Sequence, residues 1–298
     1  MRVFGRFRGV GDDERFMTPP VPCRTLSRAR PNCSVVLSTN SPFPSNDPIQ
    51  PLAHTGHHCP PVKKVTVMVE FVIPAPTTPA LAVVDGNAVF PLRRVFCVGR
   101  NYSEHAREMG HDPDREPPFF FMKPADAVVP AEGEIAFPPL TADLHHEVEL
   151  VVAIGKGGVD ISPEQALEHV WGYGVGIDLT RRDIQAQAKK QGRPWDWAKG
   201  FDESAPCSPL RPVSSVGHPG EGAIWLKVNG EERQRGDLAD QIWGVAEVIS
   251  YASKSVALQA GDLILTGTPA GVGALQPGDK VEAGIAGVGE LSFTLGQH

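Results

Sequence analysis

The chain has 298 residues, of which 41% are hydrophobic and 21% are charged, so it can bury the core of one large domain or two average ones. A formal net charge of −7 disfavours a nucleic-acid partner, and no apolar run approaches the roughly 18 residues of a membrane helix. The 31 glycines and 29 prolines favour a turn-rich protein of many strands. Five cysteines without a C-x-x-C pair argue against a disulfide framework, and we expect a cytoplasmic protein.

Residues 1–67 differ in composition from the rest of the chain. They hold nine lysines and arginines against four acids, ten prolines and three of the five cysteines, without a sustained hydrophobic period. The stretch at 54–59 has three histidines and a cysteine, but its flanking prolines and the lack of a second ligand pair favour a solvated tail over a metal site. We predict a disordered tail or a misassigned translation start over 1–67, and one folded domain over 68–298.

From Met68 onward the hydrophobic pattern becomes regular. Asp85-Gly86-Asn87 separates two short apolar runs and predicts a hairpin. The segment EVELVVAI at 147–154 becomes continuously apolar, which is typical of a strand buried on both faces. Further strands are predicted over 95–98, 174–177, 224–229, 262–266, 280–282 and 291–295.

Helical segments are fewer. Asn101 is a good N-cap for a helix over 102–109, and helices are also predicted over 163–169, 180–190 and 240–253. A regular alternation of strand and helix is missing, so we predict an α+β fold with β-rich mixed sheets rather than a doubly wound sheet.

Several common motifs are absent. Gly172, Gly174 and Gly176 suggest a dinucleotide-binding turn, but the G-x-G-x-x-G pattern needs a further glycine at 177, which is Ile177. Neither a P-loop nor a G-x-S-x-G nucleophile motif occurs.

Three carboxylates have the spacing of a metal site. Glu147 and Glu149 are two apart on the predicted strand, so their side chains share a face, and Asp178 ends a neighbouring apolar strand. Oxygen ligands alone favour Mg²⁺, Mn²⁺ or Ca²⁺ over zinc. On spacing alone, the alternative is that the glutamates line a solvated strand face and that Asp178 caps a helix.

His105 and Glu108 are three apart on a predicted helix and therefore share one face. A carboxylate beside an imidazole orients it as a general base for water, although an isolated pair of this kind is more often an exposed surface pair. Lys123, Arg182 and Lys199 stand in apolar or acidic settings where they could surround an anionic substrate, or lie on the surface as snorkelling side chains. The glycine-rich stretch after Thr266 could direct backbone N–H groups to an oxyanion.

The sequence also resembles the fumarylacetoacetate hydrolase family, in its acylpyruvase and fumarylpyruvate hydrolase branch. The resemblance runs in order from about residue 68 to 296, and residues 1–67 have no counterpart in it. The motifs that carry it are CVGRNYSEH at 97–105, FMKP at 121–124, LHHEVEL at 144–150, GIDLTRRDIQ at 176–185, KVNG at 227–230 and LTGTPAGVG at 265–273.

The resemblance implies a β-rich roll, a homodimer and one Mg²⁺ or Mn²⁺ ion per subunit. It assigns metal-binding roles to Glu147, Glu149 and Asp178, and the base to the His105–Glu108 pair. The implied substrate-contacting positions are Lys123, Arg182, Gln185, Lys199 and Thr268, of which we count Lys199 among the catalytic residues.

The activity that the resemblance implies is that of a hydrolase acting on carbon–carbon bonds in ketonic substances. We expect it to cleave a 2,4-dioxo acid (an acylpyruvate), with fumarylpyruvate giving fumarate and pyruvate. The same site could instead serve an oxaloacetate decarboxylase or a 2-hydroxy-diene-dioate isomerase or decarboxylase, and a non-catalytic scaffold would show a damaged site. A second substrate carboxylate would need further cations, for which Arg100, Arg107 and Lys189 are candidates that the sequence cannot place.

Overall fold

The computed structural model describes residues 71–104 and 116–297, which form mixed β-sheets with a few short helices. In this described part, the largest sheet has eight strands in the order β4-β3-β15-β8-β9-β11-β5, with β12 paired to β9. Its strands are β3 (Arg94–Gly99), β4 (Phe119–Lys123), β5 (Val128–Pro130), β8 (Val148–Ile154), β9 (Val170–Ile177), β11 (Ala205–Cys207), β12 (Arg211–Pro212) and β15 (Asp262–Leu265).

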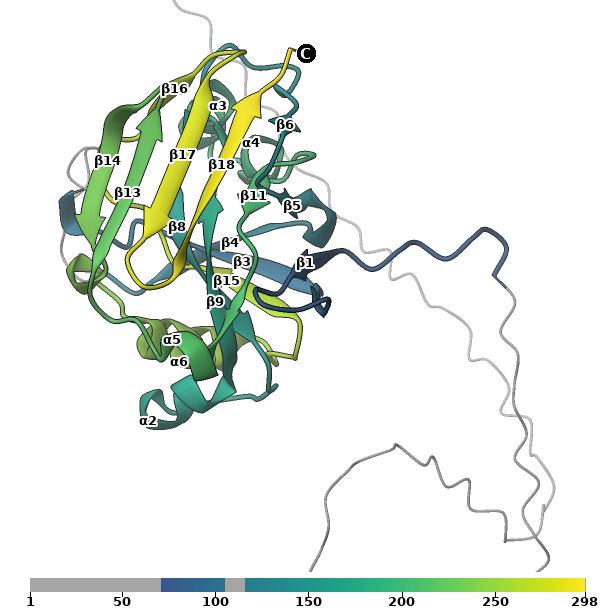
Figure 1. The fold of residues 1–298 in the computed structure, drawn as a ribbon, viewed down its shortest axis with the longest axis vertical. Coiled ribbons are helices and arrows are strands. Elements are labelled where there is room, and N and C mark those ends of the chain that lie inside the picture. Colours follow the sequence, from purple (N-terminus) through teal and green to yellow (C-terminus); the bar gives the residue numbers. More distant parts are fainter. Residues whose placement is uncertain (1–70, 105–115, 298) are drawn as a thin grey trace, which may run out of the picture. The chain divides into compact units, whose positions relative to one another are not determined.

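A second sheet packs against this one, in the order β14-β13-β17-β18-β6. Figure 1 shows its four longer strands side by side across the upper part of the molecule. Its strands are β6 (Glu134–Ile135), β13 (Ala223–Val228), β14 (Glu231–Asp237), β17 (Lys280–Ile285) and β18 (Gly289–Leu295).

Smaller sheets complete the described strands. A hairpin pairs β1 (Ala80–Ala82) with β2 (Val89–Pro91), and β7 (Leu144–His146) lies between β10 (Thr180–Arg181) and β16 (Gly273–Leu275). The described α-helices are α2 (Pro163–Ala166), α3 (Arg182–Gln191), α4 (Asp196–Lys199), α5 (Val213–Val216) and α6 (Val245–Ser255). Short 3-10 helices lie between these elements, at Ala125–Ala127, Leu167–His169 and Leu238–Asp240.

Strand β8 is buried on both faces, which explains its continuous apolar run. Val148, Leu150, Val152 and Ile154 belong to the larger core, which includes β13, β17 and β18. The alternate side chains at 151 and 153 pack with the β1–β2 hairpin in a second, smaller core. Glu149 lies on this second face, where the pattern changes from apolar to acidic toward the start of the strand.

The predicted hairpin, the predicted strands and the α+β architecture are confirmed, with ends that differ by a few residues. The helix predicted over 180–190 starts later, because residues 180–181 pair with β7 as strand β10. The helix predicted over 240–253 begins at Val245, where the Glu247 carboxylate accepts a hydrogen bond from the Gly244 N–H. The segment 1–67 and most of the helix predicted over 102–109 lie outside the described residues.

The three glycines of β9 have a packing role. A Cβ at Gly172 would lie 2.2 Å from the backbone oxygen of Arg211, and one at Gly174 would lie 2.9 Å from the Leu210 side chain. These glycines therefore let the segment around residues 207–212 approach β9 closely. This packing explains the spaced glycines that suggested a dinucleotide-binding turn.

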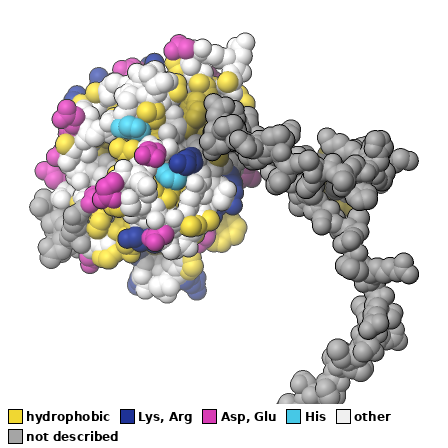
Figure 2. Space-filling view, turned by 90° about the horizontal axis from the view of Figure 1, so that it is seen from below, with side chains coloured by type: hydrophobic (Ala, Val, Ile, Leu, Met, Phe, Trp, Pro, Cys, Tyr) yellow, Lys and Arg dark blue, Asp and Glu magenta, His cyan; other side chains and the backbone are white. Residues whose placement is uncertain are grey.

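The face of the molecule in Figure 2 mixes acidic, basic and apolar side chains without a large patch of one charge. None of the helices in 71–104 and 116–297 has the length and apolar content that crossing a bilayer requires.

Candidate active site

Three carboxylates meet where β8 and β9 lie side by side. Because the two strands are antiparallel and pair Val148 with Ile177, Glu147 and Asp178 stand opposite each other, and the Asp178 N–H donates to the Glu147 carbonyl at 2.8 Å. Glu147, Glu149 and Asp178 are all buried, and each offers an oxygen within 4.8 Å of the others. The structure thus brings together the predicted metal ligands.

Buried cations neutralise part of this acidic cluster. The Lys199 ammonium, at the end of α4, lies 2.8 Å from Glu147 Oε2 and 2.6 Å from Asp178 Oδ2. Arg182, at the start of α3, bonds Glu147 Oε1 at 2.5 Å. Burial alone would lower the pKa of Lys199, but Asp178 and Glu147 raise it above its usual value, so this side chain stays charged.

Glu149 differs from the other two carboxylates because no cation of the described chain pairs with it. Its Oε2 accepts a hydrogen bond of 2.7 Å from the Gly267 N–H. Burial and the negative charges of Asp178 and Glu147 raise the pKa of Glu149 well above its usual value. A buried acidic cluster with one uncompensated carboxylate and only oxygen donors fits a hard divalent cation, which would favour the charged form of all three ligands.

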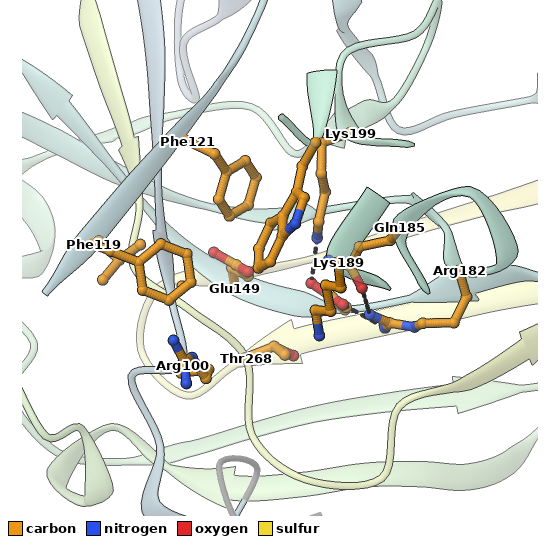
Figure 3. Close-up of a pocket in the computed structure, with 13 residues that line it drawn as sticks. Arg100, Phe119, Phe121, Glu149, Arg182, Gln185, Lys189, Lys199 and Thr268 are labelled. Carbon is orange, nitrogen blue, oxygen red and sulfur yellow. Dashed lines mark hydrogen bonds and ion pairs between the residues drawn. The ribbon is translucent and has the colours of Figure 1, made fainter. Parts of the chain in front are cut away.

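A pocket opens beside these carboxylates (Figure 3). Arg182, Gln185, Lys199 and Thr268, for which the resemblance implies substrate contact, line it together with Glu147 and Glu149. The other lining residues are Val98, Gly99, Arg100, Phe119, Phe121, Lys189 and Trp195. Arg182 Nη1 donates to Gln185 Oε1 at 2.7 Å, which leaves the Gln185 NH₂ group as the donor available to a ligand.

Lys123 lies behind this cluster. Its ammonium is 2.8 Å from Asp178 Oδ1 and donates to the backbone oxygens of Leu179, at 3.1 Å, and Lys199. Lys123 is fully buried and is not among the described residues that line the pocket. The structure therefore places Lys123 where it holds Asp178, and its contact with substrate stays a prediction.

Gln234 supports Thr268, and no motif in the sequence points to this role. This buried amide on β14 donates from Nε2 to Thr268 Oγ1 at 2.8 Å and to the Pro269 carbonyl at 2.9 Å. Its Oε1 lies 2.9 Å from His146 Nδ1 and accepts from the Val148 N–H at 3.2 Å. Since Thr268 Oγ1 already accepts a hydrogen bond, its own proton remains free to donate within the pocket.

Asn101, the predicted helix N-cap, joins two loops of the site. Its Nδ2 donates to the carbonyls of Trp243 and Thr266, each at 2.8 Å, and its Oδ1 accepts from the Trp243 N–H. A Cβ at Gly267 would lie 2.7 Å from the Asn101 side chain, and the φ of +96° there suits glycine. This close contact holds the loop whose N–H bonds Glu149. His105 and Glu108 lie outside the described residues, so the predicted base stays a prediction.

The sequence model of the family described as fumarylacetoacetate (FAA) hydrolase C-terminal matches residues 94–295. The chain belongs to this family. The match confirms the resemblance carried by the motifs and the fold class expected from it.

Solved structures of the fumarylacetoacetate hydrolase family include fumarylpyruvate hydrolase from Pseudomonas aeruginosa in complex with Mn²⁺ and pyruvate. That protein is 54% identical to this chain, with a TM-score of 0.75, and the match covers 77% of this chain and 100% of that one. A Burkholderia cenocepacia protein with a provisional fumarylpyruvate hydrolase name is 63% identical, with a TM-score of 0.73 and the same coverage. The mitochondrial oxaloacetate tautomerase of Mus musculus is 44% identical over 203 residues, which are 68% of this chain and 91% of the relative.

Proposed function

We propose that this protein hydrolyses a carbon–carbon bond in a 2,4-dioxo acid, with fumarylpyruvate as its substrate and fumarate and pyruvate as its products. The observation that carries the proposal is the buried set Glu147, Glu149 and Asp178 beside a pocket lined by cations. The 54% identity to a fumarylpyruvate hydrolase that binds Mn²⁺ and pyruvate supports it.

In this proposal Glu147, Glu149 and Asp178 hold one Mg²⁺ or Mn²⁺ ion per subunit. That ion supplies a Lewis acid for the 2-oxo acid end of the substrate. Lys199 and Arg182 balance the charge of the carboxylates and keep them ionised, while the Thr268 hydroxyl and the Gln185 NH₂ group donate to substrate oxygens.

Water is the second substrate. His105, oriented by Glu108, takes a proton from it, and the oxygen adds to the carbonyl carbon distal to the 2-oxo acid. Cleavage of the bond between C3 and C4 then leaves fumarate, and its electron pair passes to pyruvate as the enolate, which takes up a proton. Donors in the pocket stabilise the negative oxygen that forms at C4.

Tautomerisation or decarboxylation of oxaloacetate is the second candidate. It is supported by relatives from Mus musculus and Arabidopsis thaliana, both named oxaloacetate tautomerase and 44% identical to this chain. Such a reaction also passes through an enolate but needs no attack by water. Isomerisation or decarboxylation of a 2-hydroxy-diene-dioate likewise needs no attack by water.

Parallel assays on one preparation separate these candidates. Fumarylpyruvate, oxaloacetate and acetylpyruvate are incubated with the full chain, with Mg²⁺ or Mn²⁺ and with EDTA, and the products are identified. The proposal predicts metal-dependent release of fumarate and pyruvate at the highest kcat/KM of the three. Faster conversion of oxaloacetate, with no fumarate from fumarylpyruvate, would assign the site to the second candidate.

We also propose a homodimer, which sedimentation of the purified chain tests directly. The cytoplasmic location expected from the cysteines stays a prediction, since the Mus musculus relative is named as mitochondrial.

A further inference from the structure

Two more cations line the pocket, at the side away from Lys199. Arg100 follows Gly99, the last residue of β3, and Lys189 lies in the last turn of α3 (Figure 3). We propose that Arg100 and Lys189 bind a second carboxylate of the substrate, so that this site selects dicarboxylic 2-oxo acids. The inference rests on the proposed function and names its substrate class.

The charges of the pocket divide into two groups. Lys199 and Arg182 each have an acidic partner among Glu147 and Asp178. Arg100 and Lys189 form no ion pair with any acid in the described ranges. Two neighbouring cations without counter-ions attract an anionic group of a ligand.

Aromatic rings hold these two cations without neutralising them. The Arg100 guanidinium lies 4.8 Å from the centre of the Phe119 ring, and the Lys189 ammonium lies 5.2 Å from that of Trp195. The two rings meet edge to face at 5.5 Å, so the aromatic pair links one cation to the other. Contacts of this kind orient a cation and leave its full charge for a ligand.

Arg100 and Lys189 are each held in an energetically unfavourable state in the protein without a ligand. Arg100 has a φ of +56°, a left-handed conformation that residues other than glycine seldom adopt. Although the Lys189 side chain is exposed, the protein around it removes part of its hydration, and this loss, together with the positive charges of Arg182 and Arg100, lowers its pKa. A carboxylate between Arg100 and Lys189 would offset this repulsion, as a neutral end of a ligand would not.

The ligand therefore has two different ends. Its 2-oxo acid end would lie at the metal ion that the three carboxylates hold in the proposed function. Its other end, at Arg100 and Lys189, is anionic. Fumarylpyruvate has this form, with carboxylates at C1 and C7, whereas acetylpyruvate ends in a methyl group.

The test uses two ligands that the proposed hydrolysis cannot cleave and that differ only at the far end. The full chain, loaded with Mg²⁺, is titrated in a calorimeter with 2-oxoheptanedioate and with 2-oxoheptanoate. We expect the diacid to bind about 10- to 100-fold more tightly, the range of one or two charge-assisted hydrogen bonds. The double variant Arg100→Gln, Lys189→Gln should reduce diacid binding to that of the monoacid and leave the monoacid unchanged.

Lys190→Gln is the matched control. Lys190 is exposed, as Lys189 is, but does not line the pocket, so its substitution should leave both affinities unchanged. Equal binding of the two ligands to the unaltered protein, binding of neither, or equal weakening of both by the double variant would overturn the inference. A protein that prefers the diacid but does not cleave fumarylpyruvate would overturn the proposed function alone.

Discussion

Glu147 and Asp178 share the ammonium of Lys199, whereas Glu149 forms no ion pair with a described cation and accepts a hydrogen bond from the Gly267 N–H. The three carboxylates are therefore unequal before any metal binds. Removing the charge of Glu149 should weaken metal binding without harming the metal-free fold, because that charge is the one the protein itself compensates least.

We predict that Glu149→Gln weakens Mg²⁺ or Mn²⁺ binding by about 100-fold or more, since even side chains that only support a ligand contribute about 10–100-fold. The amide can still accept from the Gly267 N–H, and one buried negative charge disappears. The metal-free variant should thus be at least as stable as the unaltered protein. Calorimetry and urea unfolding measure both effects, with the exposed Glu132→Gln as the control.

A second prediction at this scale concerns the base. His105→Ala should lower kcat by roughly 10²–10⁴-fold, the usual contribution of a general base, while the metal affinity stays the same. Steady-state kinetics and metal titration of the same sample check this. Unchanged turnover of fumarylpyruvate would remove His105 from the mechanism.

At the scale of elements, strand β14 supports the pocket from the second sheet. Gln234 bonds His146 at the end of β7, Val148 at the start of β8, and Thr268 and Pro269 after β15, so one amide of the second sheet joins segments from two other sheets. The sequence of β14, EERQRGD, is almost entirely polar and suggests an exposed strand. Only the register of β14 against β13 shows that Gln234 is the one side chain of this strand that is fully buried.

Gln234→Leu should lower the free energy of unfolding by about 2–4 kcal/mol, because several buried polar groups lose a partner at once. It should also raise KM, since the Thr268 hydroxyl loses the bond that orients it. Urea unfolding and steady-state kinetics measure the two effects. Gln276→Leu, at an exposed position, is the control, and equal stability of the two variants would contradict the account.

The sequence predicted those elements whose pattern is local. The alternation of β8 indicated that Glu147 and Glu149 share a face, and the apolar strand before Asp178 indicated that it follows β9. The predicted start of the helix over 180–190 was less accurate, because residues 180–181 pair with β7, a strand that is distant in the sequence. Asn101 has the residue type of a helix cap, but its partners, Trp243 and Thr266, lie more than a hundred residues away.

At the scale of the whole molecule, segments far apart in the sequence form one site. β8 supplies Glu149, the residues just before β8 and just after β9 supply Glu147 and Asp178, α3 and α4 supply Arg182 and Lys199, and the loop after β15 supplies Thr268. Cations pair with two of the carboxylates, and two further cations, which have no acidic partner within 71–104 and 116–297, line the same pocket. This distribution of charge is what the proposed substrate, with an anion at each end, requires.

The most direct measurement is the fate of water oxygen. The full chain is incubated with fumarylpyruvate and Mn²⁺ in water enriched in ¹⁸O, and the products are analysed by mass spectrometry. The account predicts metal-dependent formation of fumarate with at least one ¹⁸O in its new carboxylate, together with an equal amount of pyruvate. Loss of CO₂ or isomerisation without fumarate, or equal cleavage in EDTA, would contradict it.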